Sequence, residues 1–165
     1  MQSNHVFHTL APWYTPSSTV LILGSLPSPK SRQLSCYYGH PQNRFWKVLS
    51  TLTGDECGTS PIQRRAFCDR HGIALWDVIS ECDIAGASDA SIKNSVPNPI
   101  EDIISKAPIQ AVFTTGKKAH ALYQKHLLPR CHIQDICLPS TSAANCATKM
   151  EDLLTAYAAI LPYLK

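Results

Sequence analysis

The sequence of 165 residues has none of the long hydrophobic runs that place a chain in a membrane. No apolar segment approaches the roughly 20 residues needed to span a bilayer. The amino-terminal stretch MQSNHVFHTLAPW also lacks a basic start followed by an apolar segment, so it does not resemble a signal peptide. We therefore expect a cytoplasmic protein with no membrane partner.

The common metal-binding and nucleotide-binding motifs are also missing. Seven cysteines are present, but no Cys-x-x-Cys pair occurs, and the irregular spacing fits neither a zinc site nor an iron–sulfur cluster. Several of these cysteines lie in apolar segments, where a reduced thiol behaves as a small core residue. Neither Gly-x-x-x-x-Gly-Lys-[Ser/Thr] nor Gly-x-Gly-x-x-Gly occurs, which weakens a third interpretation, an ordinary nucleotide-binding domain. We expect no metal and no cofactor.

Charge of either sign is scarce and nearly balanced. The 15 Lys and Arg against 12 Asp and Glu give a net charge of +3, which permits a polyanionic partner without requiring one. The length suits one domain over residues 1–165, and a chain of this size buries roughly two thirds of its unfolded surface. We expect this domain to act as a monomer.

Short apolar runs alternate with segments of helical periodicity along the chain. The runs at 19–23, 73–79, 109–114 and 132–138 predict strands, and 45–52, 61–70, 98–106, 116–127 and the segment from 148 onward predict helices. Asn98 and Glu101 have the spacing of a capping box. The alternation predicts an α/β fold: a three-layer α/β/α sandwich around a short, mainly parallel sheet of four strands.

Polar segments follow three of the predicted strands, at 24–46, 115–118 and 139–145. Ligands of parallel sheets bind beyond the carboxyl ends of the strands, so these segments are the candidate site. The first, GSLPSPKSRQLSCYYGHPQNRFW, combines hydroxyls, basic side chains, two tyrosines and an amide. Rings for stacking, an amide for the base edge and a phosphate-binding rim are what an extruded nucleotide needs. A long connecting loop with ordinary turn residues is the alternative.

The motifs GSLPS and YYGHPQNRFWKVL resemble the uracil-DNA glycosylase superfamily, and the resemblance spans roughly residues 20–161. The HP-x-NRFWKV stretch is similar to the mismatch-specific uracil-DNA glycosylases. Together with the later LPSTSAAN, the motifs look most like the hypoxanthine-DNA (deoxyinosine) glycosylase family. That family's fold agrees with the α/β/α sandwich predicted above.

The resemblance implies a role for each matching position. Tyr38 would stack on the extruded base and Asn43 would be the catalytic amide, although Asn43 is also a plausible helix N-cap. The other residues expected to bind the base are Tyr37, Gly24, Ser25, His40 and Thr115. The residues expected to contact DNA phosphate are Ser28, Lys30, Arg32, Ser140, Thr141, Ser142 and Lys117, for which a solvated surface or a polar turn is the alternative.

Two positions depart from the pattern of the uracil enzymes. Leu26 stands where those enzymes place a water-positioning Asp or Asn, and Leu138 replaces the His that stabilises the departing base. Asp77 and Asp89 also match family positions and are weaker candidates, and Trp76 is expected in the core. The resemblance thus implies a monofunctional glycosylase for deaminated bases in DNA, hypoxanthine first and uracil second. The alternatives are a uracil- or mismatch-specific glycosylase and a non-catalytic binder of damaged DNA.

Overall fold

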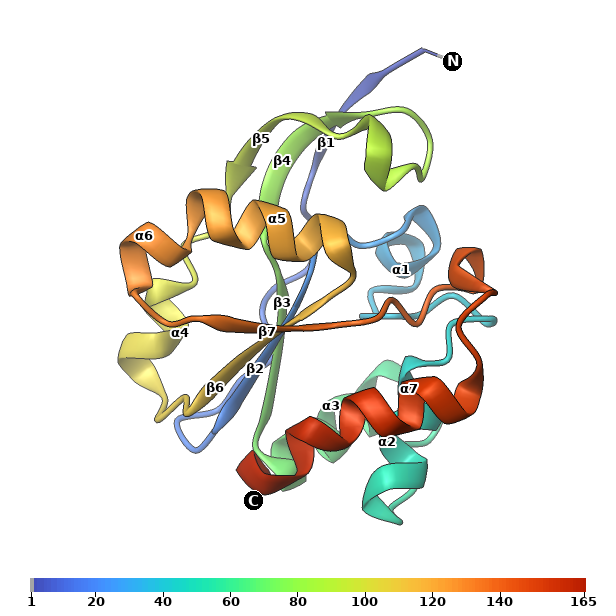
Figure 1. The fold of residues 1–165 in the computed structure, drawn as a ribbon, viewed down its shortest axis with the longest axis vertical. Helices are drawn as coiled ribbons and strands as arrows, with labels where there is room; N and C mark the ends of the chain where they lie inside the picture. Colours follow the sequence, from blue (N-terminus) through green and yellow to red (C-terminus); the bar gives the residue numbers. More distant parts are fainter. Residues whose placement is uncertain (1) are drawn as a thin grey trace.

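The computed structural model describes residues 2–165, which form two β-sheets with helices around them (Figure 1). Four strands make a parallel sheet in the order β3-β2-β6-β7. They are β2 (Val20–Gly24), β3 (Ile73–Asp77), β6 (Ala111–Thr115) and β7 (Asp135–Leu138). The predicted four-stranded parallel sheet is confirmed.

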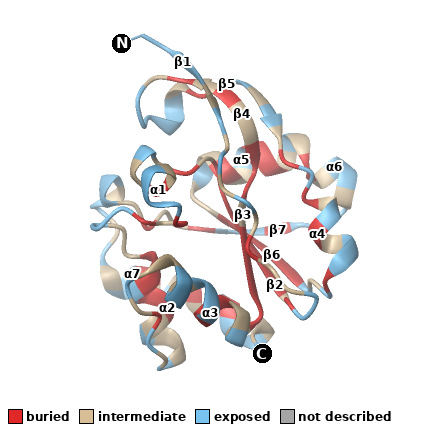
Figure 2. Ribbon diagram, turned by 180° about the vertical axis from the view of Figure 1, so that it is seen from behind, coloured by how far each residue is buried: buried red, intermediate tan, exposed pale blue. Residues whose placement is uncertain are grey.

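Alternate residues of β2 enter two different cores, because successive side chains of a strand point to opposite faces. Val20 and Ile22 belong to one cluster of buried residues and Leu21 and Leu23 to the other. The first face is covered by α2 (Phe45–Thr53), α3 (Pro61–His71), α7 (Met150–Tyr157) and the 3₁₀ helix η3 (Ala158–Tyr163). The second is covered by α4 (Glu101–Lys106), α5 (Lys117–His126) and α6 (Leu128–Cys131). The central strands are buried between these layers (Figure 2), so the α/β/α sandwich is confirmed.

A second, antiparallel sheet extends from the first and was not expected from the sequence. It has the order β1-β4-β5, with β1 (Asn4–Phe7), β4 (Ile79–Ile84) and β5 (Lys93–Pro97). The apolar run 73–79 is therefore not one strand, since the chain leaves the parallel sheet at Val78 and enters β4. Most residues of β1 and β5 are exposed, so neither strand carries the apolar signal that predicts a buried strand.

The capping box expected at Asn98 and Glu101 is wrong. Helix α4 begins at Glu101 after Ile100, without a side-chain cap. The amide of Asn98 instead donates to the carbonyls of Asp77 at 2.9 Å and Ile79 at 3.0 Å. It thus holds the chain where β3 passes into β4.

Three short helices complete the described chain. They are α1 (Pro29–Leu34), η1 (Asp89–Ser91) and η2 (Ala143–Asn145). None of the helices within residues 2–165 has the length and apolar character needed to cross a membrane. The cysteines are all free, and Cys36, Cys57, Cys68 and Cys82 are buried as the sequence suggested.

Candidate active site

A pocket of about 1120 Å³ lies at the carboxyl ends of the four parallel strands. The last residue of every strand lines it: Gly24, Asp77, Thr115 and Leu138. Segments distant in the sequence meet here because parallel strands present their carboxyl ends at one edge of a sheet. Of the residues singled out in the sequence, the pocket wall contains Gly24, Ser25, Ser28, Tyr37, Tyr38, His40, Asn43, Thr115, Lys117, Ser140, Thr141 and Ser142.

Tyr38 lies against the pocket with one face of its ring already covered. The ring stacks on Phe45 with centroids 3.8 Å apart and planes 14° apart. Its hydroxyl is 3.0 Å from Thr115 Oγ1, and the backbone at Tyr38 has a φ of 52°. Desolvation, and then the charge of Asp77, raise the pKa of the phenol well above its ordinary value. Tyr38 is therefore a neutral ring with one face and one edge committed to the protein.

Tyr37 reaches the pocket wall mainly as part of the core. Its hydroxyl donates to the carbonyl of Ala11 at 2.8 Å, and its ring packs edge-on against Trp13. Burial raises the pKa of this phenol, and the charge of Asp77 adds to the effect. The two adjacent tyrosines thus have different surroundings, and Tyr38 is the one positioned by polar groups of the strand ends.

Asn43 is locked at the start of α2 by two donors to its side-chain oxygen. The backbone N–H of Phe45 donates to Oδ1 at 3.0 Å, and the hydroxyl of Thr141 donates to the same atom at 2.8 Å. Only the oxygen of a carboxamide can accept a hydrogen bond, so these two donors fix the orientation of the Asn43 side chain. No described residue hydrogen-bonds to Nδ2. The N-cap of α2 is Arg44, so Asn43 is not the helix cap that was its alternative interpretation. Its Nδ2 is a donor available to the pocket.

Arg44 joins the loop between β7 and α7 to the motif that carries Asn43. Its backbone N–H donates to the carbonyl of Thr141 at 3.1 Å, and its guanidinium donates to the carbonyls of Thr148 and Asn145. The structure shows that Arg44 is committed to protein carbonyls.

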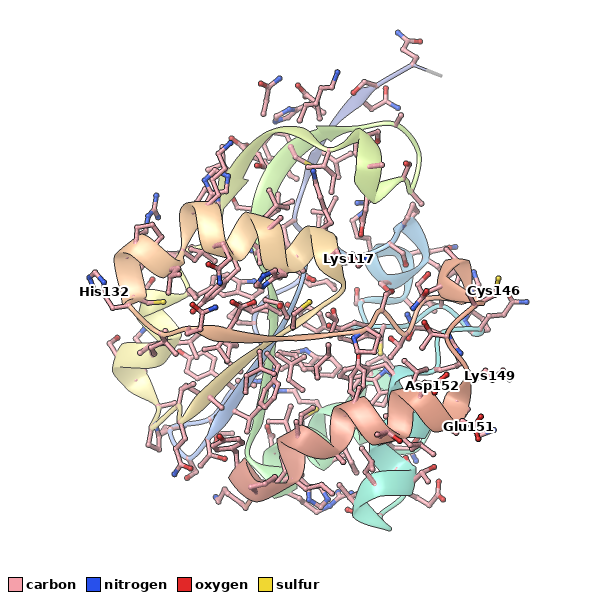
Figure 3. The ribbon with its side chains drawn as sticks, in the orientation of Figure 1. Lys117, His132, Cys146, Lys149, Glu151 and Asp152 are labelled. Atoms are coloured by element: carbon pink, nitrogen blue, oxygen red, sulfur yellow. The ribbon has the colours of Figure 1, made fainter. Side chains whose placement is uncertain are left out.

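The expected phosphate contacts fall into three groups. Lys117 is exposed at the first residue of α5 and borders the pocket (Figure 3). Ser140 and Ser142 accept backbone N–H donors, so their own hydroxyl protons stay available, whereas the hydroxyl proton of Thr141 points to Asn43.

The third group lies on α1. Ser28 caps this helix, and its hydroxyl bonds to Ser31. Lys30 and Arg32 are not among the residues that line the pocket, and Arg32 donates to the carbonyl of Pro27. The pocket therefore gathers most of the expected residues but leaves these two basic side chains outside its wall.

The family follows from a match over most of the chain. Residues 11–165 match the family described as the Uracil DNA glycosylase superfamily. This chain belongs to that superfamily.

Relatives of this superfamily member include two curated archaeal proteins, each named Hypoxanthine DNA glycosylase. The protein from Methanosarcina barkeri is 35% identical over 105 residues, which are 62% of this chain and 66% of the relative. The protein from Methanosarcina acetivorans is 30% identical over 131 residues, which are 78% of this chain and 82% of the relative. A candidate uracil DNA glycosylase from Methanosarcina acetivorans, solved by solution NMR, shares the fold with a TM-score of 0.78 at 24% identity. That match covers 93% of this chain and 98% of the other.

Two carboxylates in the pocket of this superfamily member were only weak candidates in the sequence. Ser25 donates to Asp89 Oδ1 at 3.1 Å, and desolvation is the main cause that raises the pKa of the Asp89 carboxyl. Asp77 accepts a hydrogen bond from His8 on one oxygen. No signal in the sequence relates His8 to Asp77, because 69 positions separate them.

Leu26 and Leu138 also line the pocket. Apolar groups therefore stand at both places where the uracil enzymes were expected to carry polar catalysts. Within the described residues, no group of three or more His, Cys, Asp or Glu could hold a metal ion. The polar groups that the pocket offers to a substrate are the amide of Asn43, the two carboxylates and the hydroxyls around them.

Proposed function

We propose that this chain is a monofunctional DNA glycosylase that hydrolyses the N-glycosidic bond of deaminated bases and leaves an abasic site. Hypoxanthine is the first substrate and uracil the second. The observation that carries the proposal is that the ring of Tyr38 and the amide of Asn43 line one pocket at the carboxyl edge of the sheet. Two relatives named Hypoxanthine DNA glycosylase support the choice of base.

The pocket is suited to hold a base that has left the duplex. Phe45 covers one face of the Tyr38 ring, so an extruded base would stack on the opposite face. Such stacking contributes about 1–3 kcal/mol per base. The hydrogen bond from Tyr38 to Thr115 keeps the ring in place before the base arrives, which lowers the entropic cost of binding.

Asn43 acts in this proposal as a donor and not as a base. Both lone-pair positions of Oδ1 are occupied by Phe45 N–H and Thr141, so the amide cannot accept a proton from water. Its Nδ2 is available to donate to the departing base, where negative charge develops as the bond breaks. A donor already aimed at developing charge stabilises the transition state without reorganisation.

The order of bond breaking explains how the reaction proceeds although Leu26 cannot position water. The sugar becomes oxocarbenium-like, and the Asp89 carboxylate lies in the same pocket, where its negative charge stabilises such a sugar. Once the glycosidic bond has largely broken, a weakly activated water suffices. Lys117 is the only lysine among the residues that line the pocket, and it lies at the exposed rim. We therefore assign the nucleophile to water and not to a lysine amine.

Cleavage of oligonucleotides tests the proposal. Duplexes with a single deoxyinosine or deoxyuridine should yield strand breaks only after alkali, which opens abasic sites. Asn43→Ala should lower kcat about 100- to 1000-fold, as loss of an oxyanion-type donor does, with little change in KM. Asn4→Ala, an exposed asparagine on β1, is the matched control and should be fully active. Equal cleavage by Asn43→Ala and the wild type would remove Asn43 from catalysis, and breaks without alkali would contradict a monofunctional enzyme.

The second candidate is a non-catalytic binder of damaged DNA. The apolar side chains of Leu26 and Leu138 in the pocket favour it. Tight binding to deoxyinosine DNA with no alkali-labile product would establish this alternative in place of the glycosylase.

A further inference from the structure

We propose that Asp77 reads the edge of the extruded base and that His8 is the positioning residue that holds Asp77 for this task. The free oxygen of the carboxylate would accept the ring N–H that deamination creates. The inference rests on the proposed function and adds to it the basis of base selection. It is carried by a buried pair of side chains that spans the N-terminal segment and the end of β3.

The pair is almost completely shielded from solvent. His8 Nε2 lies 2.8 Å from Asp77 Oδ2, and the side chains are 3% and 5% exposed. The backbone N–H of Leu10 donates to His8 Nδ1 at 3.2 Å. Because Nδ1 accepts, the proton of the neutral imidazole is on Nε2 and is donated to Asp77. His8 therefore satisfies one carboxylate oxygen and fixes the direction of the other.

The second oxygen, Oδ1, receives no hydrogen bond from any described residue, and Asp77 lines the pocket. A Cβ on Gly24 would lie only 2.5 Å from Oδ1, so the absence of a side chain at Gly24 makes room for this atom. Asn98 holds the backbone carbonyl of Asp77 from the other side. The oxygen is not fully buried, so it faces the solvent of the pocket, and a ligand N–H at this point would take the place of water as its donor.

The chemistry of deamination matches an acceptor that cannot donate. Adenine N1 and cytosine N3 carry lone pairs, whereas hypoxanthine N1 and uracil N3 carry a hydrogen beside a carbonyl. An ionised carboxylate only accepts, so it pairs with the deaminated bases and repels the lone pair of their parents. The same contact serves a purine and a pyrimidine. Guanine and thymine also carry a ring N–H, so the remaining walls of the pocket must exclude them.

Asp77→Asn tests the reading of the base. We compare deoxyinosine with N1-methyldeoxyinosine, which lacks the ring N–H, in one duplex. The wild type should prefer deoxyinosine, and Asp77→Asn should lower kcat/KM for deoxyinosine about 10- to 100-fold, the range for a hydrogen bond to a charged group. The ratio of kcat/KM for deoxyinosine to kcat/KM for N1-methyldeoxyinosine should fall as well. Asp83→Asn is the matched control, because Asp83 also binds a histidine at 2.8 Å but its side chain is 33% exposed and does not line the pocket.

His8→Ala tests the positioning role, with His5→Ala as its control. His8→Ala should reduce the preference for deoxyinosine in the wild type and change nothing further in the Asp77→Asn background, because it acts through that carboxylate. His8→Gln should restore part of the preference, since its amide can donate to Asp77. If His8→Ala fails to fold, Gly24→Ala replaces it, since its methyl group displaces Oδ1 while the histidine stays in place.

The outcomes separate the two proposals. A wild type that cleaves neither deoxyinosine nor deoxyuridine overturns the proposed function and this inference with it. A wild type that cleaves deoxyinosine, together with an Asp77→Asn variant whose ratio between the two substrates is unchanged, overturns this inference alone. An equal loss on both substrates assigns Asp77 to the chemistry of bond cleavage and also overturns the reading of the base.

Discussion

The amide of Asn43 is useful to a reaction only if it cannot rotate. Thr141 provides half of that restraint, because its hydroxyl donates to Oδ1 from a loop that lies almost 100 residues further along the chain. The side chain of Thr141 is itself buried, so no water can replace the hydroxyl easily. A residue expected to bind phosphate thus orients the candidate catalytic amide.

Replacing Thr141 by Val keeps the shape and removes this donor. We expect a loss of about 1–2 kcal/mol in the free energy of unfolding, since Oδ1 keeps only the Phe45 N–H. We also expect kcat on deoxyinosine DNA to fall about tenfold, because the Asn43 carboxamide is no longer held in one orientation. Urea unfolding and single-turnover kinetics measure the two effects. Thr155→Val, on the exposed side of α7, should leave kcat unchanged, and an equal effect of both variants would contradict the role of Thr141.

Single residues differ in how far the sequence reveals them. Tyr38 and Asn43 lie within one motif, so their proximity in the pocket could be predicted. His8 and Asp77 approach each other because the N-terminal segment pairs with β4. Neither sequence segment contains a pattern that predicts this contact. Asn98 has the pattern of a helix cap, but its amide finds carbonyls of the β3–β4 connection instead.

At the scale of elements, Arg44 connects the start of α2 to the loop before α7. Three carbonyls of that loop, those of Ser142, Asn145 and Thr148, lie within reach of its guanidinium. Tyr157 adds a hydrogen bond from α7 to the carbonyl of Pro139. The loop is therefore attached at both ends, although it forms only one short 3₁₀ helix of its own.

Arg44→Ala should release this loop. We expect a loss of about 2–3 kcal/mol in the free energy of unfolding, because several carbonyls lose a charged donor at once. Amide hydrogens within 139–149 should exchange faster, and KM for DNA should rise. Hydrogen exchange read by mass spectrometry measures the local effect. Arg65→Ala, on the exposed side of α3, is the control. Unchanged exchange in the loop of Arg44→Ala would show that Arg44 does not hold it.

Most of the parallel sheet could be predicted because β2, β3 and β6 are buried, mainly apolar runs that end at a turn residue or a polar group. The edge strand β7 is less regular, since two of its four residues are exposed. The antiparallel sheet could not be predicted. Its edge strands are short and largely exposed, and its central strand continues directly from β3 after Val78. Helix α1 could not be predicted, because it is only six residues long and rich in polar side chains.

For the whole molecule, ion pairs outside the pocket join parts of the chain that the central sheet does not connect. Asp55, in the loop after α2, contacts Arg70 and His71 at the end of α3 at 3.0 Å and 2.9 Å. Asp83 on β4 contacts His5 on β1 and the amide of Asn94.

These contacts shift the pKa values of the two carboxyls. The hydrogen bond with His71 is the main cause that holds the pKa of Asp55 below the ordinary value of 3.8. For Asp83, the main cause of the lowered pKa is the hydrogen bond from the Asn94 amide. Asp89 has the opposite shift, since desolvation raises its pKa.

These opposite shifts predict opposite pH dependences of stability. A carboxyl whose pKa is lowered by folding stabilises the fold above its unfolded pKa, and this contribution is lost as the pH falls through the folded pKa. A carboxyl whose pKa is raised by folding stabilises the fold at pH values below its unfolded pKa. This contribution is lost as the pH rises through the folded pKa. We therefore expect the stability advantage of the wild type over Asp55→Asn to shrink between about pH 5 and about pH 3. The difference between wild type and Asp89→Asn should instead shift in favour of the wild type over the same interval. Urea unfolding at several pH values measures both, and a common sign for the two variants would contradict the assignment.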